Sequence, residues 1–221
     1  MATSGRGQGD KPEPDTQEHW DKVYKTKPVN GVSWFRPHLE RSLALIERAD
    51  PHHDAAVIDI GGGHSTLIDD LVKSGRTDLT VLDISQAALD VARLRLEQEN
   101  KGHSINWLRA DITKVELPSS RFDIWHDRAV FHFLTEVEAR QAYVRQALLS
   151  VKPGGHVIVA TFGPDGPKQC SGLDVVNYDS QSLHKQFGRR FKLVEADTEL
   201  HGTPFGTTQQ FLYCFCKVSP A

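Results

Sequence analysis

One stretch of nine residues, V-I-D-I-G-G-G-H-S from Val57 to Ser65, constrains the fold more than any other. The run Val57–Ile60 is typical of a buried parallel strand, and three successive glycines follow it where a helix is predicted over Ser65–Ser74. Glycines allow unusual backbone dihedrals and a close approach of a ligand to the main chain, and the helix behind them begins with free N–H groups. The stretch therefore predicts a strand–turn–helix unit with a ligand at its turn.

The spacing within this turn indicates which kind of ligand fits. A dinucleotide would place its pyrophosphate on the helix N-terminus, with the spacing G-x-G-x-x-G. Here Gly61, Gly63 and Ser65 give a spacing close to G-x-G-x-G, and Asp59 in front of them would repel a pyrophosphate and attract an ammonium group. The turn therefore favours a ligand with an amino-acid end and a nucleoside end over NAD.

Strands and helices are predicted to alternate around this unit. The expected strands are Ala56–Ile60, Leu79–Asp83, Ile105–Ala110, Phe122–Trp125 and His156–Phe162, and the expected helices are Ser65–Ser74, Gln86–Asn100 and Glu136–Val151. Two further strands, Phe191–Leu200 and Gln210–Val218, are joined by a turn at residues 202–206. The predicted fold is α/β: a Rossmann-like, seven-stranded, mostly parallel sheet with a C-terminal antiparallel hairpin and helices on both faces. An NAD-type Rossmann protein, the fallback interpretation, would have a longer chain and a further parallel strand in place of the hairpin.

Composition sets the domain organisation and excludes several classes of partner. Residues 1–14 are rich in Gly, Pro and charge and are expected to be a disordered tail, with a single domain over residues 15–221. A net charge of −3 gives no reason to expect nucleic acid or a membrane surface as a partner. No apolar run approaches the roughly 20 residues that span a bilayer, so we expect a cytoplasmic protein. Three cysteines do not make a disulfide framework.

The glycine turn and the acids at three successive strand ends resemble a class I S-adenosylmethionine-dependent methyltransferase over Thr16 to Val218. In that family the first strand ends in D/E-x-G-x-G-x-G, which Asp59, Gly61 and Gly63 match, while Ser65 replaces the last glycine. The resemblance implies that S-adenosylmethionine is the cofactor. It also implies that Asp83 accepts the ribose hydroxyls with Ile84 beside it, and that Asp111 lies at the adenine amino group with Ile112 against the ring. Either acid could instead cap the segment that follows it.

Two further segments of the chain resemble parts of the same family. Asp127, at the end of the fourth strand, is expected beside the methionine part of the cofactor. Residues 16–37 resemble an aromatic N-terminal lid, in which Trp34 would cover the cofactor and Arg36 would pair with its carboxylate. An aromatic pair before a helix, Trp34 and Phe35, is also consistent with simple core packing.

The methyl acceptor is less closely defined by the sequence. Asp127-Arg128-Ala129 resembles the thiopurine and thiol methyltransferase branch, which acts on small, soft nucleophiles such as a thiol or selenium centre. Protein-lysine methyltransferases have a similar opening but usually Asp-Lys/Arg-Gly at this point, so a protein substrate is the alternative. A cofactor-binding regulator without chemistry is a third interpretation.

Three residues are candidates for catalytic groups near the acceptor. His201 ends the sixth strand, His132 follows the fourth strand by about one helical turn, and Tyr178 closes the loop of residues 163–178, which is expected to select the substrate. No histidine spacing supports a zinc site, so no metal is expected. Cys214 and Cys216 are interpreted as small apolar residues of a strand, and Cys170 is expected over the active site.

Overall fold

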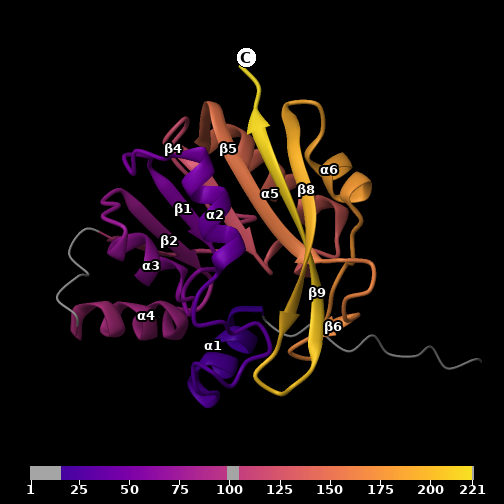
Figure 1. Cartoon of the computed structure of the whole chain (residues 1–221). Coiled ribbons are helices and arrows are strands. Elements are labelled where there is room, and N and C mark those ends of the chain that lie inside the picture. The colour runs from indigo at the N-terminus through magenta and orange to yellow at the C-terminus, as the bar shows by residue number, and fades with distance from the viewer. Residues whose placement is uncertain (1–15, 99–104, 221) are drawn as a thin grey trace, which may run out of the picture.

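The computed structural model describes residues 16–98 and 105–220, and its centre is one seven-stranded sheet (Figure 1). The strand order is β3-β2-β1-β4-β5-β9-β8. The strands are β1 (Val57–Ile60), β2 (Leu79–Asp83), β3 (Ile105–Arg109), β4 (Phe122–Arg128), β5 (Val151–Phe162), β8 (Phe191–Gly202) and β9 (Thr208–Val218). The first five are parallel, and β9 runs antiparallel to both β5 and β8. The predicted fold class is therefore confirmed, and β8 runs in the same direction as the first five strands.

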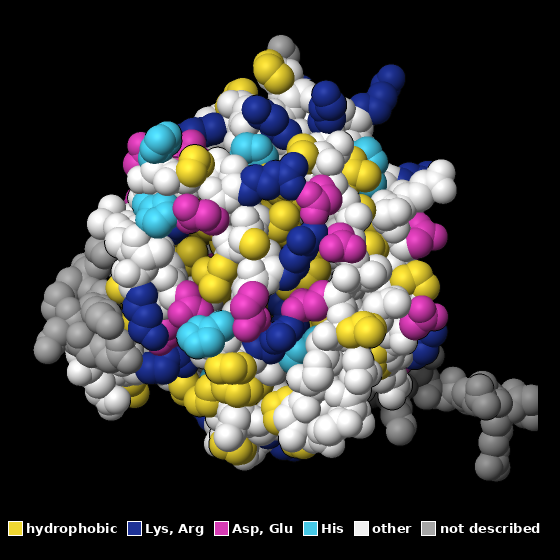
Figure 2. Space-filling model, viewed as in Figure 1, with side chains coloured by type: hydrophobic (Ala, Val, Ile, Leu, Met, Phe, Trp, Pro, Cys, Tyr) yellow, Lys and Arg dark blue, Asp and Glu magenta, His cyan; other side chains and the backbone are white. Residues whose placement is uncertain are grey.

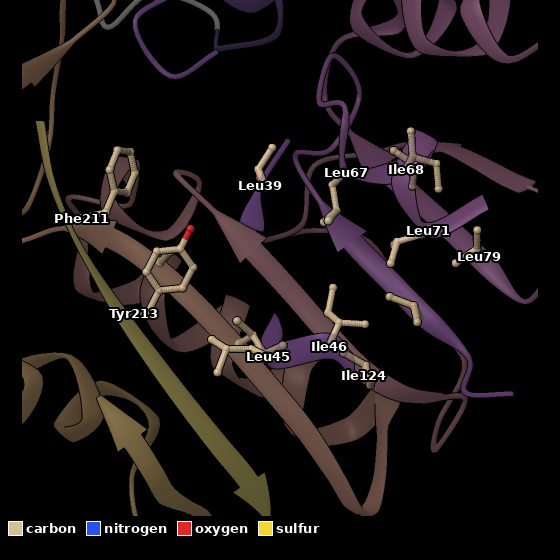
Figure 3. Packing of buried hydrophobic residues seen from close by; sticks show 14 of the residues in the cluster. Leu39, Leu45, Ile46, Leu67, Ile68, Leu71, Leu79, Ile124, Phe211 and Tyr213 are labelled. Atoms are coloured by element: carbon tan, nitrogen blue, oxygen red, sulfur yellow. The ribbon is translucent and has the colours of Figure 1, made fainter. Parts of the chain in front are cut away.

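Helices cover both faces of the sheet. One face packs against α2 (Glu40–Ala49), α3 (Leu67–Lys73) and α4 (Gln86–Gln98), and the other against α5 (Val137–Ser150) and α6 (Ser180–Phe187). In Figure 3, Leu45 and Ile46 of α2 lie over the sheet beside Ile124 of β4 and Tyr213 of β9. Each strand near the centre is thus buried on both sides, as its apolar sequence requires.

The first helix, α1 (Thr16–Thr26), lies at one edge of the sheet rather than on a face (Figure 1). Its Asp21 Oδ1 accepts a hydrogen bond of 2.5 Å from Ser85 Oγ, directly before α4. Carboxylates are favourable near a helix N-terminus, where free N–H groups carry partial positive charge. Asp21 therefore attaches α1 to the start of α4, beside the end of β2.

Ion pairs attach α2 and the segment before it to β8. Arg41 and Arg48 both bond to Glu195, and Arg36 bonds to Glu199. Figure 2 shows basic and acidic side chains interspersed on this face of the molecule. These pairs are partly exposed and contribute little individually to stability, but they fix the position of residues 36–48 against the hairpin.

Several elements differ from the sequence prediction. β4 continues three residues past its predicted end at Trp125, to Arg128. β5 begins at Val151, five residues before its predicted start at His156. Both strands are longer because the pairing of β4 with β5 extends over the added residues. The helix α6, the one-turn 3₁₀ helix η2 (Phe131–Phe133) and the short strands β6 (Gln169–Cys170) and β7 (Leu173–Asp174) were not predicted. The expected tail at residues 1–14 and the predicted end of the helix at Asn100 lie outside the described residues.

No helix among the described residues is both long and apolar enough to cross a lipid bilayer.

Candidate active site

A pocket lies at the carboxyl ends of β1, β2 and β4, where ligands bind in open α/β sheets. Its empty space is about 1170 Å³, including the mouth that opens to solvent. The lining includes the turn after β1, the ends of β2 and β3, the end of β4, and residues of the N-terminal segment.

The glycines after β1 are needed because other side chains pack against the turn. Gly61 has φ +69°, and a Cβ there would lie 2.1 Å from Val130 Cγ2. A Cβ on Gly62 would lie 2.1 Å from Asp59 Oδ2, and one on Gly63 would lie 3.0 Å from Asp83 Oδ2. The bare turn therefore brings the main chain next to two buried carboxylates, as the opening stretch of the sequence indicates.

Asp83, the acid at the end of β2, is buried, and the protein itself occupies only about half of its hydrogen-bond acceptor sites. Asp83 Oδ1 accepts the Ser85 N–H at 2.8 Å and Oδ2 accepts the Gly63 N–H at 3.2 Å. A carboxylate offers about four lone-pair sites, so about two remain for a ligand in the pocket. Burial raises the pKa of Asp83 to about 6, because these two hydrogen bonds only partly offset desolvation. The structure thus gives Asp83 a capping contact and leaves acceptor sites free for a ribose.

The acid after β3 also lines the pocket but is more exposed. Asp111 Oδ1 accepts hydrogen bonds from the Thr113 N–H at 2.9 Å and from Thr113 Oγ1 at 2.7 Å, and Lys114 lies 3.0 Å from Oδ2. Burial raises the pKa of Asp111, but these contacts outweigh it and leave the pKa below its ordinary value. Asp111 therefore remains ionised at neutral pH. Ile84 and Ile112 line the pocket beside the two acids.

The acid at the end of β4 is not in the pocket lining. Asp127 is fully buried and accepts the N–H groups of Val130 and Phe131, at 2.9 and 3.1 Å, and the Tyr143 hydroxyl at 2.6 Å. Side chains alternate across a strand, so Asp127 points away from the face that carries His126 and Arg128, both of which line the pocket. In this structure the Asp127 carboxylate holds the loop after β4, and its expected contact with methionine stays a prediction. Burial raises its pKa to about 7.

Aromatic residues of the N-terminal segment form one wall of the pocket. The Trp20 ring lies 5.9 Å from Trp34 and 5.0 Å from Phe133, which follows β4, and Tyr24 lies 5.1 Å from His64. All five line the pocket, so residues of the predicted lid contact both the glycine turn and the β4 loop.

Arg36 lines the pocket too, but its guanidinium already pairs with Glu199 and lies 3.6 Å from Glu40. The structure therefore places Arg36 near the site without leaving its charge unpaired.

The three candidate catalytic residues lie outside the pocket lining. His132 is fully buried, and its Nδ1 accepts the Phe162 N–H at 3.1 Å; burial lowers its pKa to about 3. His201 donates from Nε2 to the Ser33 carbonyl at 2.7 Å, and burial with nearby Arg128 lowers its pKa. The Tyr178 hydroxyl is buried without a partner among the described residues, and burial raises its pKa. None of the three reaches the pocket in this structure.

The lining also includes His64, His126 and Arg128, which were not among the predicted site residues. His64 lies inside the nine-residue stretch, and burial, with Arg95 nearby, lowers its pKa to about 4, so it is neutral at pH 7. Ala129 also lines the pocket and has φ +76°, a left-handed conformation that favours glycine.

Only one of the three cysteines reaches the pocket. Cys170, in β6, lines it as expected and lies against Ser33, with burial raising the pKa of its thiol to about 11. Cys214 and Cys216 are buried in β9, and burial raises the pKa of both thiols to about 12. All three are free thiols. In the part of the chain that the structure describes, no group of three His, Cys, Asp or Glu residues is arranged to hold a metal ion.

Comparison with known proteins agrees with this geometry. Residues 57–155 match the family model described as a methyltransferase domain. The chain is 24% identical over 193 residues to EEF1A lysine methyltransferase 2 of Homo sapiens. The matched region covers 81% of this chain and 75% of that protein. It is 28% identical over 146 residues to the ubiquinone biosynthesis O-methyltransferase of Coxiella burnetii. This match covers 66% of this chain and 57% of that protein.

A solved structure with the same fold is the 1,6-didemethyltoxoflavin-N1-methyltransferase of Burkholderia thailandensis, with bound S-adenosylhomocysteine. It has a TM-score of 0.66 and 15% identity, and covers 92% of this chain and 84% of its own. The matched domain and these relatives indicate a methyltransferase, and the solved structure shares its fold. The enzyme's cofactor is S-adenosylmethionine.

The residues of the pocket fit this cofactor. Asp83 has acceptor sites left for ribose hydroxyls, and Asp111 lies with Ile112 at the next strand end. Asp59 Oδ2 is buried in the lining without a hydrogen-bond partner among the described residues. A carboxylate oxygen in that state suits a ligand with an ammonium group.

Proposed function

We propose that this enzyme transfers the methyl group of S-adenosylmethionine to a small molecule with a soft nucleophile, such as a thiol or a selenium centre. The observation that carries the proposal is the ring contact of 5.0 Å between Trp20 and Phe133, which joins the N-terminal segment to the loop after β4 above the pocket. The wall beneath it is apolar, with Leu39, Ala129 and Val130. An apolar wall of this kind favours a small acceptor and helps to exclude water from the reacting atoms.

The ionisable groups of the lining support a nucleophile that needs no strong base. When bound, S-adenosylmethionine supplies a methyl group that is already electrophilic, so a base is needed only for an acceptor that arrives protonated. The three acids of the described lining are those assigned to the cofactor, Asp59, Asp83 and Asp111. His64 has a lowered pKa, and both ring nitrogens of His126 are hydrogen-bonded.

Thiols lose a proton far more easily than lysine amines, with ordinary pKa values of about 8.5 and 10.4. A pocket without a free strong base is therefore better suited to a thiol or selenol, which forms its own anion near neutral pH.

The second candidate is methylation of a protein lysine. It is favoured by the similarity to EEF1A lysine methyltransferase 2, which by its name methylates a lysine of EEF1A. A protein substrate would insert one side chain beneath the aromatic segment, which would have to move to admit it. The two candidates differ in whether the contact between Trp20 and Phe133 persists during turnover.

One assay separates the two candidates. The full-length enzyme is incubated with methyl-labelled S-adenosylmethionine and a panel of thiols, selenols, amines and carboxylates, and in parallel with purified EEF1A and a whole-protein extract. Saturable transfer to a thiol or selenol supports the proposal. Transfer to protein with none to any small molecule would replace it by the lysine alternative. The variant Asp83→Asn, with a weakened cofactor site, is the matched background control.

A further inference from the structure

Positive and negative charges occupy different parts of the pocket. Its three acids, Asp59, Asp83 and Asp111, belong to β1, the end of β2 and the segment after β3, which are neighbours in the sheet. Its two arginines, Arg36 and Arg128, belong to the segment before α2 and to the end of β4. The acids fit the cofactor, so the charge among the arginines bears on the second ligand, the methyl acceptor.

The side chain of Arg128 points away from the acids. In the sheet, Arg128 of β4 pairs in register with Ala160 of β5, which pairs with Tyr213 of β9. Arg128 Nε donates to the Tyr213 hydroxyl at 3.1 Å, and the guanidinium carbon lies 4.1 Å from the centre of the Phe211 ring, also in β9 (Figure 3). The side chain therefore crosses β5 past the small Ala160, whereas β1 lies on the opposite side of β4.

The protein leaves the charge of Arg128 without a counter-charge. Its Nη1 donates to the Trp34 carbonyl at 3.1 Å, and its Nη2 is buried without a hydrogen-bond partner among the described residues. Tyrosine hydroxyl, peptide carbonyl and phenylalanine ring are all neutral partners. By contrast, Arg36 bonds to Glu199 and lies 3.6 Å from Glu40. Of the two arginines of the described lining, Arg128 is thus the one whose charge is not balanced by an acid.

The ionisable groups near this guanidinium are uncharged at neutral pH. Burial and Arg128 lower the pKa of His132 to about 3, and they also lower the pKa of His201. Burial raises the pKa of Tyr213, and it raises the pKa of the Cys170 thiol in the same pocket to about 11. None of these four side chains supplies a negative charge, so this part of the pocket stays positive.

A buried cation without a counter-charge is costly, because it has lost water and gained no ion partner. The face of Phe211 offsets a part of that cost through a cation–π contact. A carboxylate matches a guanidinium best, since its two oxygens can accept hydrogen bonds from the planar fork. A negatively charged acceptor should therefore bind better here than a neutral or positive one of equal size.

We propose that Arg128 is a specificity-determining residue, which selects a methyl acceptor that carries a negative charge, such as a small thiol with a carboxylate. The carboxylate pairs with the guanidinium, and the sulfur is left free to meet the methyl group in the apolar part of the pocket. A lysine amine, which arrives as a cation, is disfavoured by the same charge. The inference rests on the proposed function, because it assigns the class of acceptor for that site.

Three thiols of similar size and different charge test this assignment: 3-mercaptopropionate, 3-mercaptopropanol and 3-aminopropanethiol. For each thiol, kcat/KM of methyl transfer from labelled S-adenosylmethionine is measured with the full chain. The ratio of kcat/KM for the anionic thiol to that for the neutral thiol should fall about ten- to a hundredfold in Arg128→Gln, the range for a hydrogen bond to a charged group. Comparing the same thiols in both enzymes cancels their differences in intrinsic reactivity.

Two further variants separate charge from structural support. Arg128→Lys keeps the charge and should retain a large part of the wild-type ratio. Arg48→Gln is the matched control, because Arg48 also lies over a phenylalanine of β9, 5.3 Å from the centre of the Phe215 ring, but outside the pocket lining. Its acid partner Glu195 keeps Arg41, and the ratio should not change. By calorimetry, Arg128→Gln should alter the affinity for S-adenosylhomocysteine less than about twofold.

The outcomes distinguish this inference from the proposed function. If the wild-type enzyme methylates no thiol or selenol, the proposed function fails and the inference falls with it. If thiols are methylated but Arg128→Gln leaves the ratio unchanged, the inference alone is overturned. A ten- to hundredfold loss of S-adenosylhomocysteine affinity with an unchanged ratio would assign the charge to the cofactor and also overturn it.

Discussion

Replacing Asp83 by asparagine removes a buried negative charge from the pocket and keeps the shape of the side chain. In the structure the Asp83 carboxylate accepts the N–H groups of Gly63 and Ser85 and has about two acceptor sites left. The asparagine amide can accept at one oxygen only, and its NH₂ group would face an N–H donor. Hydrogen bonds to charged groups contribute about 1.5–3 kcal/mol, so the dissociation constant of S-adenosylhomocysteine should rise about ten- to a hundredfold.

The pH dependence of binding gives this prediction a second measurement. Burial, with Asp59 and Asp21 nearby, raises the pKa of Asp83 to about 6. The ionised carboxylate is the form with free acceptor sites, so affinity should rise between about pH 5 and pH 7 and then level off. The Asp83→Asn variant should lose this rise.

The same shift has a defined effect on stability of the free protein. The unfolded pKa of Asp83, 3.8, lies below the folded value of about 6, so the folded state binds more protons between these limits. The contribution of Asp83 to the free energy of unfolding therefore falls as pH rises from about 4 to 6. Asp83→Asn should remove that component, which thermal unfolding in the absence of cofactor measures.

Calorimetric titration with S-adenosylhomocysteine from pH 5 to pH 8 is the assay. Asp90→Asn is a matched control, because Asp90 is exposed on α4 and bonds to Gln86. A folded Asp83→Asn protein with wild-type affinity at pH 7.5, or with an unchanged pH profile, would refute the assignment of Asp83 to the ribose.

Three further substitutions test other parts of the site. Trp20→Ala removes the ring contact that covers the pocket and should lower kcat/KM about tenfold or more, since small displacements of reacting groups are costly; unchanged kcat/KM would contradict the lid. Gly62→Ala would place a methyl group 2.1 Å from Asp59 Oδ2 and should abolish S-adenosylhomocysteine binding with the circular dichroism spectrum preserved; retained binding would mean that the turn can shift. Tyr143→Phe leaves Asp127 without its hydroxyl donor and should lower the free energy of unfolding by about 1–3 kcal/mol in urea denaturation; a smaller loss would mean that water replaces the hydroxyl.

Most of the sheet could be predicted from local sequence, because buried parallel strands are short apolar runs and their ends are marked by glycine or acid. The fourth strand was predicted to end at Trp125, since His126-Asp127-Arg128 is polar; in the structure, pairing with β5 buries the first two of these residues. The helix α6 was missed because its sequence is largely polar. A local signal was present, since Asp179 and Ser182 form a capping box at its start.

The three acids of the pocket lining were predictable for the same reason: Asp59, Asp83 and Asp111 all stand at or near strand ends, which meet at one edge of a parallel sheet. The hydrogen-bond network around those acids could not be predicted from the sequence. The contact between His126 and Ser42 joins residues 84 positions apart, and Ser42 gives no signal on a helix of ordinary composition. Strand alternation within H-D-R was the available clue that His126 and Arg128, and not Asp127, face the pocket.

Ala129 combines two properties that are usually separated, a left-handed backbone and a methyl group in the pocket wall. Its φ of +76° costs an L-residue on the order of 1 kcal/mol, which glycine would avoid. Glycine would also enlarge the pocket by one carbon at its wall. Ala129→Gly is therefore expected to relieve backbone strain and at the same time to leave slightly more room in the pocket.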